Sequence, residues 1–259
     1  MASETAFSGS DQHQLLPEPK PSLNSGSVVI RTLAAAVAGL FGAILSWKAI
    51  EYIGEVFVLP ADLAGLAFGQ IPAPEVQAKV VAATVENQIR NAAVWLGTAG
   101  AIMGAFSSLS ICLSRRLRLT SFRMIFVTVL AGTLFGALAG VVGVWIDTVS
   151  RQNLEVGATS PSEHITLLMH SITWMIFGLG IGLGISFGGI QHRISRIEST
   201  VVIGLLGMVG GCLFPIAAAV LFPAVNSTWP VPAFEPTSGL ILWLGLPYVL
   251  MGMAIGRNG

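Results

Sequence analysis

The chain has 259 residues, of which 53% are hydrophobic and only 10% are charged. A soluble domain has about 25% charged residues, so most of the surface of this protein must face lipid. The 13 basic and 13 acidic residues cancel, and we expect no nucleic-acid partner. Cys112 and Cys212 lie in apolar stretches without metal-ligand spacing, so we expect no disulfide framework, no metal and no cofactor.

Residues 1–26 are rich in Ser, Pro, Glu and Gln and contain no apolar run of signal-peptide length. This composition predicts a disordered tail. Because no cleavable signal is expected, the first apolar segment is predicted to remain as a membrane span. Residues 27–259 are then predicted to form one transmembrane domain.

Six apolar stretches follow the tail. A helix that crosses the hydrocarbon core of a bilayer needs about 20 predominantly apolar residues, and the stretches meet or approach this length. They cover residues 28–47, 91–113, 124–145, 172–190, 201–222 and 239–256. The sequence therefore predicts an all-α fold, a polytopic bundle of six transmembrane helices in contact with the lipid bilayer.

Basic residues indicate the orientation of the bundle. The loop between the second and third spans contains Arg115, Arg116 and Arg118, and the loop between the fourth and fifth contains Arg193. By the positive-inside rule, both loops are expected in the cytoplasm. Since the number of spans is even, both termini are expected on the same side, with the protein in the plasma (inner) membrane.

The tryptophans give a second indication of orientation. All six fall near the predicted outer ends of spans: Trp47, Trp95, Trp145, Trp174, Trp229 and Trp243. The indole ring prefers the boundary between membrane and water, so we interpret them as interfacial anchors. An aromatic cage for a cationic ligand is the alternative.

The connection at residues 48–90 is predicted to be helical and to lie outside the membrane. Lys48, Glu51 and Glu55 recur at helical spacing, so the first span is predicted to continue as a helix as far as Pro60. Residues 75–90 have the pattern of an amphipathic helix lying on the outer surface. We interpret segment 48–90 as a surface-packed linker and as the contact for a protein partner, in preference to a lid over a pore.

An internal repeat is the next prediction. In the odd-numbered spans, Leu40-Phe41-Gly42 matches Leu134-Phe135-Gly136, and spans two and six share a Trp-Leu-Gly motif. We interpret the chain as three two-helix hairpins of one orientation, although chance matches among common apolar residues are the alternative. Mitochondrial carriers also use three two-helix repeats, but their Pro-x-acid-x-x-base signature is absent from the odd spans. The chain resembles them in architecture only.

Small residues and prolines mark candidate helix-packing or pathway positions. These are Gly132, Gly136, Gly140, Gly180, Gly184, Gly188, Pro215 and Pro247. Glycines four residues apart let helix backbones approach closely, and packing within one chain is a simpler interpretation than a dimer interface. The two prolines are interpreted as static kinks rather than as breaks at a transport site.

No acidic or basic residue lies near the centre of a predicted span, unlike in many ion-coupled transporters. His170, near a span end, is interpreted as a solvated interfacial residue. Ser186 lies in a Gly-x-Ser-x-Gly pattern that resembles the serine motif of rhomboid proteases, but the last span has no histidine to act as a base. We therefore expect no enzymatic activity.

Two functional hypotheses follow. The first is passive or weakly coupled passage of a small uncharged solute through the bundle, which the repeat and the glycine-lined faces favour. The alternative is a non-transporting membrane scaffold or complex subunit. A continuous polar cavity would favour the first hypothesis, and a solidly packed interior the second.

Overall fold

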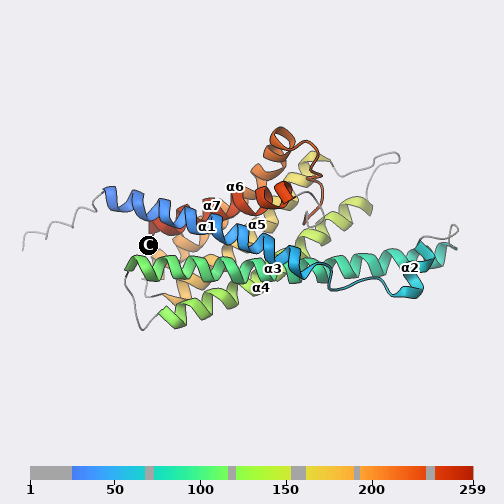
Figure 1. Cartoon of the computed structure of the whole chain (residues 1–259), viewed down its shortest axis with the longest axis horizontal. Helices are drawn as coiled ribbons and strands as arrows, with labels where there is room; N and C mark the ends of the chain where they lie inside the picture. The colour runs from blue at the N-terminus through green and yellow to red at the C-terminus, as the bar shows by residue number, and fades with distance from the viewer. Residues whose placement is uncertain are drawn as a thin grey trace, which may run out of the picture.

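The computed structural model describes residues 25–67, 73–115, 121–152, 162–189, 193–231 and 237–258. The predicted tail lies outside these ranges except for its last two positions. Within the described ranges there are seven helices and no strand (Figure 1). The helices are α1 (Ser25–Ile53), α2 (Ala61–Ala67), α3 (Pro74–Arg115), α4 (Ser121–Gln152), α5 (Glu163–Gly188), α6 (Arg193–Leu221) and α7 (Thr237–Asn258).

Six of the described helices, all except the short α2, are long and apolar enough to cross a membrane. This confirms the predicted all-α class and the six spans. The start of α1 and the end of α7 lie at one end of the bundle, where Gly256 packs against the Arg31 backbone. We call this end the termini end, and the opposite end, where α2 lies, the far end (Figure 1).

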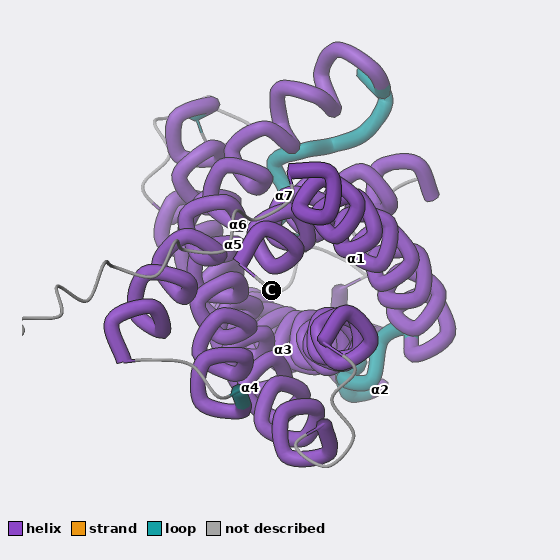
Figure 2. Tube along the Cα trace, turned by 90° about the vertical axis from the view of Figure 1, so that its left-hand side faces the viewer, coloured by secondary structure: helices purple, strands orange, loops and turns teal. Residues whose placement is uncertain are grey.

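The six spans form a closed ring. Each span contacts the next one along the chain, and α7 returns to α1 (Figure 2). The apolar stretches of α3, α5 and α7 are 56%, 61% and 67% buried, whereas those of α1, α4 and α6 are 22%, 28% and 44% buried. The ring therefore alternates three inner helices with three outer helices, and the outer ones present apolar side chains to lipid.

Aromatic side chains fill the space between α5 and α7. Trp174 and Phe177 of α5 pack against Trp243 and Tyr248 of α7, with ring centroids 5.0 to 5.9 Å apart. None of these four side chains is more than 1% exposed. We call these four residues the aromatic core. They lie at the centre of the ring.

Contacts between an inner helix and the following outer helix are built alike at three places. At each one, a glycine of the inner helix lies against the backbone of a threonine whose hydroxyl donates a hydrogen bond to the carbonyl oxygen four residues earlier. The pairs are Gly104 with Thr128, Gly182 with Thr200, and Gly256 with Thr32. An alignment that superimposes Thr32 on Thr128 does not superimpose Leu40 on Leu134, so these contacts have a different register from the sequence motifs. Triplication itself stays a prediction.

The predicted helix at residues 75–90 is present, but the prediction that it lies on the outer surface, apart from the second span, is wrong. These residues and the second span form the single 42-residue helix α3 (Figure 1). No glycine or proline lies between Pro74 and Gly97, so nothing in the sequence ends the helix where the apolar stretch begins. With a rise of 1.5 Å per residue, α3 is about 63 Å long, roughly twice the hydrocarbon thickness of a bilayer. Its first half therefore projects beyond the bundle at the far end.

The predicted extension of the first span to Pro60 is also wrong, because α1 ends at Ile53. Gly54 has a φ of 59°, in the left-handed region, and its N–H donates to the Ile50 carbonyl oxygen over 3.0 Å. A left-handed glycine after the last helical residue is a common helix terminator. Helices α5 and α6 begin at Glu163 and Arg193, before the predicted spans at residues 172–190 and 201–222. A helix can extend beyond the apolar stretch that it contains.

The interpretation of all six tryptophans as interfacial anchors is wrong for three of them. Trp95, Trp174 and Trp243 are at most 5% exposed, whereas Trp145 and Trp229 are 59% and 39% exposed. The buried three lie on inner helices, where the ring faces protein rather than the membrane boundary. His170 is likewise not solvated, since it is fully buried.

Candidate functional site

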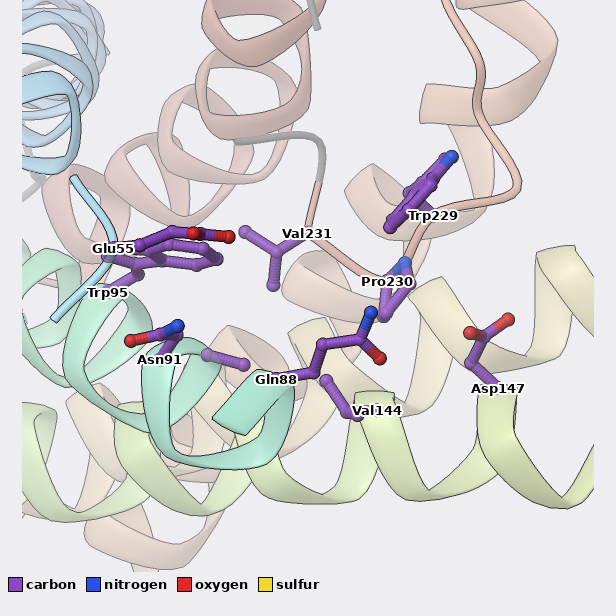
Figure 3. Close-up of a pocket in the computed structure, with 10 residues that line it drawn as sticks. Glu55, Gln88, Asn91, Trp95, Val144, Asp147, Trp229, Pro230 and Val231 are labelled. Atoms are coloured by element: carbon purple, nitrogen blue, oxygen red, sulfur yellow. The ribbon is translucent and has the colours of Figure 1, made fainter. Parts of the chain in front are cut away.

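A pocket of about 230 Å³ lies at the far end of the bundle. Its walls come from α3, α4, the segment after α1 and the connection between α6 and α7 (Figure 3). The lining residues are Glu55, Gln88, Asn91, Ala92, Trp95, Val144, Asp147, Trp229, Pro230 and Val231. We call this cavity the far-end pocket.

The side chain of Asn91 fixes one wall of the far-end pocket. Its Oδ1 accepts hydrogen bonds from the backbone N–H groups of Val56 and Phe57, at 3.1 and 2.9 Å, and its Nδ2 donates to the Phe57 carbonyl oxygen over 2.9 Å. The Trp95 indole N–H donates to the Gly54 carbonyl oxygen over 2.7 Å. Together they hold the segment that carries Glu55 against α3.

The opposite wall is fixed by His170. Its Nε2 lies 2.9 Å from the Ser227 carbonyl oxygen, and its Nδ1 accepts a hydrogen bond of 3.2 Å from the Trp243 indole N–H. Since the indole only donates, Nδ1 must be the unprotonated nitrogen, so Nε2 carries the proton and donates to Ser227. The neutral imidazole thus anchors the connection that carries Trp229 and Val231 to α5 and α7.

Two acidic side chains, Glu55 and Asp147, line the far-end pocket, and only Asp147 forms an ion pair with a described basic residue. Asp147 is 7% exposed, and its carboxylate accepts hydrogen bonds from Arg151 Nε at 2.8 and 3.0 Å. The Arg151 guanidinium also lies 5.9 Å from the centroid of the Trp229 ring. By contrast, neither the Glu55 carboxylate nor the Gln88 amide bonds to any other part of the described chain.

Two further hollows lie along α3 and the end of α4, and the smaller one shares Gln88, Asp147 and Trp229 with the far-end pocket. Hollows of about 400 and 740 Å³ share Val81, Val85, Thr148 and Gln152. Their charged side chains pair locally, Asp147 with Arg151 and Glu86 with Arg90. The hollows therefore form a mainly apolar groove without excess charge, and we call it the outer groove.

The glycines singled out in the sequence lie elsewhere, at contacts between neighbouring helices. Gly132, Gly136 and Gly140 of α4 face α3. A methyl group at Gly132 would collide with the Gly100 carbonyl oxygen, and one at Gly136 or Gly140 would also collide with the backbone of α3. The glycines of α5 face α4: an added Cβ at Gly180 would collide with Phe135, and at Gly184 and Gly188 it would lie 2.6 and 2.7 Å from Cα atoms of α4. None of the six lines the far-end pocket.

The remaining sequence candidates also lie away from the pocket. Helices α6 and α7 continue through Pro215 and Pro247, and Pro247 packs against Gly210. The kinks stay predictions. Ser186 Oγ donates to the Arg196 carbonyl oxygen over 3.0 Å and lies 2.9 Å from Thr200 Oγ1, so this hydroxyl joins α5 to α6.

Sequence reasoning missed the far-end pocket because its polar residues come from three separate segments and form no motif. One signal was present, since Asn91 and Asp147 are polar residues at the ends of apolar stretches, where a buried amide or carboxylate needs partners. No protein-family model, no curated protein and no solved structure matches this chain.

Proposed function

We propose that this integral membrane protein is a non-transporting scaffold or complex subunit rather than a solute pathway. The observation that carries the proposal is the aromatic core. The Tyr248 hydroxyl, at its centre, donates to the Ala99 carbonyl oxygen of α3 over 2.7 Å and lies 3.1 Å from Ser46 Oγ of α1. One buried side chain therefore links three spans where a solute would have to pass.

Opening a path through the centre would be costly. Separating α7 from α3 breaks the buried hydrogen bond from the Tyr248 hydroxyl to the Ala99 carbonyl oxygen, and a hydrogen bond of this kind contributes about 0.5–1.5 kcal/mol. The aromatic rings would also lose their packing contacts, and close-packed interiors resist such rearrangement. A static bundle is the lower-energy arrangement.

A partner-binding role is supported by the first half of α3. This part projects beyond the bundle beside the outer groove, and Val81, which lines the groove, is 56% exposed. A mainly apolar groove that the described chain leaves open is a candidate surface for contact with another protein. We also propose that the termini end faces the cytoplasm, because Arg31 of α1 and Arg257 of α7 lie at this end.

The test combines flux and cross-linking. The purified protein is reconstituted in liposomes, and the permeation of glycerol, urea and small sugars is followed by light scattering. A photo-reactive residue is placed at Val81 in native membranes, with Leu134 of α4, a lipid-facing position that is 60% exposed, as the matched control. We expect no flux above that of empty liposomes and one discrete cross-linked protein from position 81 only. Flux of any of these solutes would overturn the proposal.

Passage of a small uncharged solute remains the second candidate function. The far-end pocket favours it, because a pocket with polar side chains at one end of the bundle, beside the middle of α3, is where a solute would enter. This function requires the aromatic core to move during transport. It therefore predicts measurable flux in the unmodified protein, which the same liposome experiment detects.

A further inference from the structure

The described part of the connection between α6 and α7, residues 222–231, covers one side of the far-end pocket, and we call it the lid. Three of its residues, Trp229, Pro230 and Val231, line the pocket (Figure 3). The lid forms neither a helix nor a strand. Its position therefore depends on contacts with the neighbouring spans, and segments held in this way open more easily than the spans themselves.

One of these contacts requires His170 to be neutral. The Trp243 indole N–H donates to Nδ1 over 3.2 Å, and Nε2 donates to the carbonyl oxygen of Ser227 in the lid over 2.9 Å. A protonated imidazole carries an N–H on both nitrogens. In that form Nδ1 would face the indole N–H and could not accept its hydrogen bond. The side chain that holds the lid thus fits the closed arrangement only without the extra proton.

The surroundings of the His170 ring offer no charge that would stabilise its protonated form. The ring packs against Phe214 of α6, with ring centroids 5.0 Å apart, and against Trp243 of α7, and neither side chain titrates. No described acidic side chain lies within ion-pair distance of His170, which is fully buried. A buried cation without a counter-charge is costly. Water at an opened lid would stabilise the same cation.

A second group makes the closed lid costly. The Thr173 hydroxyl of α5 is buried and has no hydrogen-bond partner among the described residues. A Cβ added at Gly143 of α4 would lie 2.8 Å from this hydroxyl oxygen and 3.7 Å from Cβ of Pro230 in the lid. Thr173 and Pro230 therefore pack against the same point of α4. When the lid moves away, water can reach the hydroxyl and supply the missing hydrogen bond.

Other helical threonines do not share this arrangement. Their hydroxyls donate to the carbonyl oxygen four residues earlier, as in Thr32, Thr84, Thr128, Thr133, Thr148 and Thr200. The unpaired hydroxyl thus lies beside the lid rather than throughout the bundle.

We infer that the lid is a proton-controlled closure of the far-end pocket, shut while His170 is neutral and opened when His170 is protonated. A histidine exposed to water takes up a proton below about pH 6.5. Because the open form binds this proton more readily, opening should increase as the pH falls, by up to about tenfold per pH unit below that value. The hydrogen bond from Tyr248 to Ala99 is not part of this motion. The inference therefore goes beyond the proposed function and does not depend on it.

The test is hydrogen exchange of the full-length protein in nanodiscs at about pH 7.5 and about pH 4.5, on either side of the range in which histidine titrates. Rates are corrected for the direct effect of pH on amide exchange. We expect residues 222–231 to exchange at least about tenfold faster at the lower pH, with the middle of α3 unchanged.

Two variants remove the titration. His170→Gln places an amide near the position of Nε2, and His170→Asn places one near the position of Nδ1, and neither binds a proton in this range. In both, exchange of the lid should be the same at the two pH values. His164→Ala is the matched control, because His164 is exposed on the same helix. This variant should keep the full response to acid.

A third variant tests the unpaired hydroxyl. Thr173→Val removes it with little change of shape, so the closed lid should become more stable and exchange of residues 222–231 at least about threefold slower. Thr128→Val is the control, since the Thr128 hydroxyl bonds to the Met124 carbonyl oxygen. Exchange of the lid should not become slower in this control. Unaltered exchange in Thr173→Val would contradict a hydroxyl that the closed lid keeps from water.

The inference is overturned if exchange of the lid does not rise at low pH, or if it rises equally in the two His170 variants. The second result would assign the response to other titrating groups at this end, which are Glu55, Asp147, Glu163 and His164. If both variants are unstable on heating, nitrogen-15 resonances of the imidazole follow protonation of His170 in the unmodified protein. Exchange of the lid must then rise over the same pH range as this protonation, and a rise over a different range would overturn the inference.

The outcome is separate from that of the proposed function. A lid whose exchange is independent of pH says nothing about flux. Flux of a solute through liposomes would overturn the non-transporting role and leave the proton-controlled lid in place.

Discussion

The hydroxyl of Tyr248 in α7 donates a hydrogen bond of 2.7 Å to the carbonyl oxygen of Ala99 in α3. This carbonyl belongs to the second span, 149 residues earlier in the sequence, and both residues are fully buried. In the membrane interior no water can replace the bond. The hydrogen bond therefore joins α7 to α3 in the interior of the ring of spans.

Tyr248→Phe should lower the free energy of unfolding by about 1–2 kcal/mol, because it removes the buried hydrogen bond to the Ala99 carbonyl oxygen and the contact with Ser46. Denaturation in detergent with increasing sodium dodecyl sulfate measures this change. Tyr52→Phe is the control, since Tyr52 is 93% exposed. Equal stability of the two variants would contradict the role given to Tyr248.

Gly100→Ala should destabilise the protein by about 1–3 kcal/mol, because the added methyl group would collide with the backbone of Gly132 and force α3 and α4 apart. Gly245→Ala is a matched control in another span, where an added Cβ meets no atom within 4 Å. The melting temperatures of both variants check the prediction. A loss in the control as large as that in Gly100→Ala would show that backbone approach is not the cause.

His170→Ala should loosen the connection between α6 and α7, because the Ser227 carbonyl oxygen and the Trp243 indole N–H both lose their partner. Hydrogen exchange of residues 222–231 should become faster, while exchange in the middle of α3 stays unchanged. His164→Ala, at an exposed position of the same helix, should leave the exchange rate as it is. Unaltered exchange in His170→Ala would contradict the anchoring role.

The spans could be predicted from the sequence because apolar length depends directly on membrane thickness. The same reasoning failed for α3, since hydropathy locates the lipid boundary but not the end of a helix, and residues 75–90 continue straight into the span. Trp174 and Trp243 were placed at the membrane boundary because their positions along the helices are near it. Only the packing of α5 against α7 shows that these rings face inward.

The candidate site could not be predicted for a different reason. Glu55, Asn91 and Trp229 are far apart in the sequence and meet only because Asn91 and Trp95 bind the segment after α1. Each residue alone has an ordinary explanation as a loop acid, a helix-end amide or an interfacial tryptophan.

Topology has its own test. In a variant with Cys112→Ala and Cys212→Ala, single cysteines at Gln77 and Arg257 should react with a membrane-impermeant reagent from opposite sides of the membrane. Gln77 lies in the projecting half of α3 and Arg257 at the end of α7, and both are exposed. In intact cells only the Gln77→Cys variant should be labelled. Labelling of both would contradict the five spans, an odd number, that separate Gln77 from Arg257.

The closed centre of the bundle is tested most directly by the water accessibility of position 99. In the same cysteine-free background, Ala99→Cys places a thiol beside the aromatic core, and Gln88→Cys places one in the far-end pocket. With a small cationic thiosulfonate reagent applied to both sides of reconstituted liposomes, we expect rapid modification of Gln88→Cys and none of Ala99→Cys. Modification of Ala99→Cys at a similar rate would show that water reaches the centre of the ring, and it would contradict a non-transporting bundle.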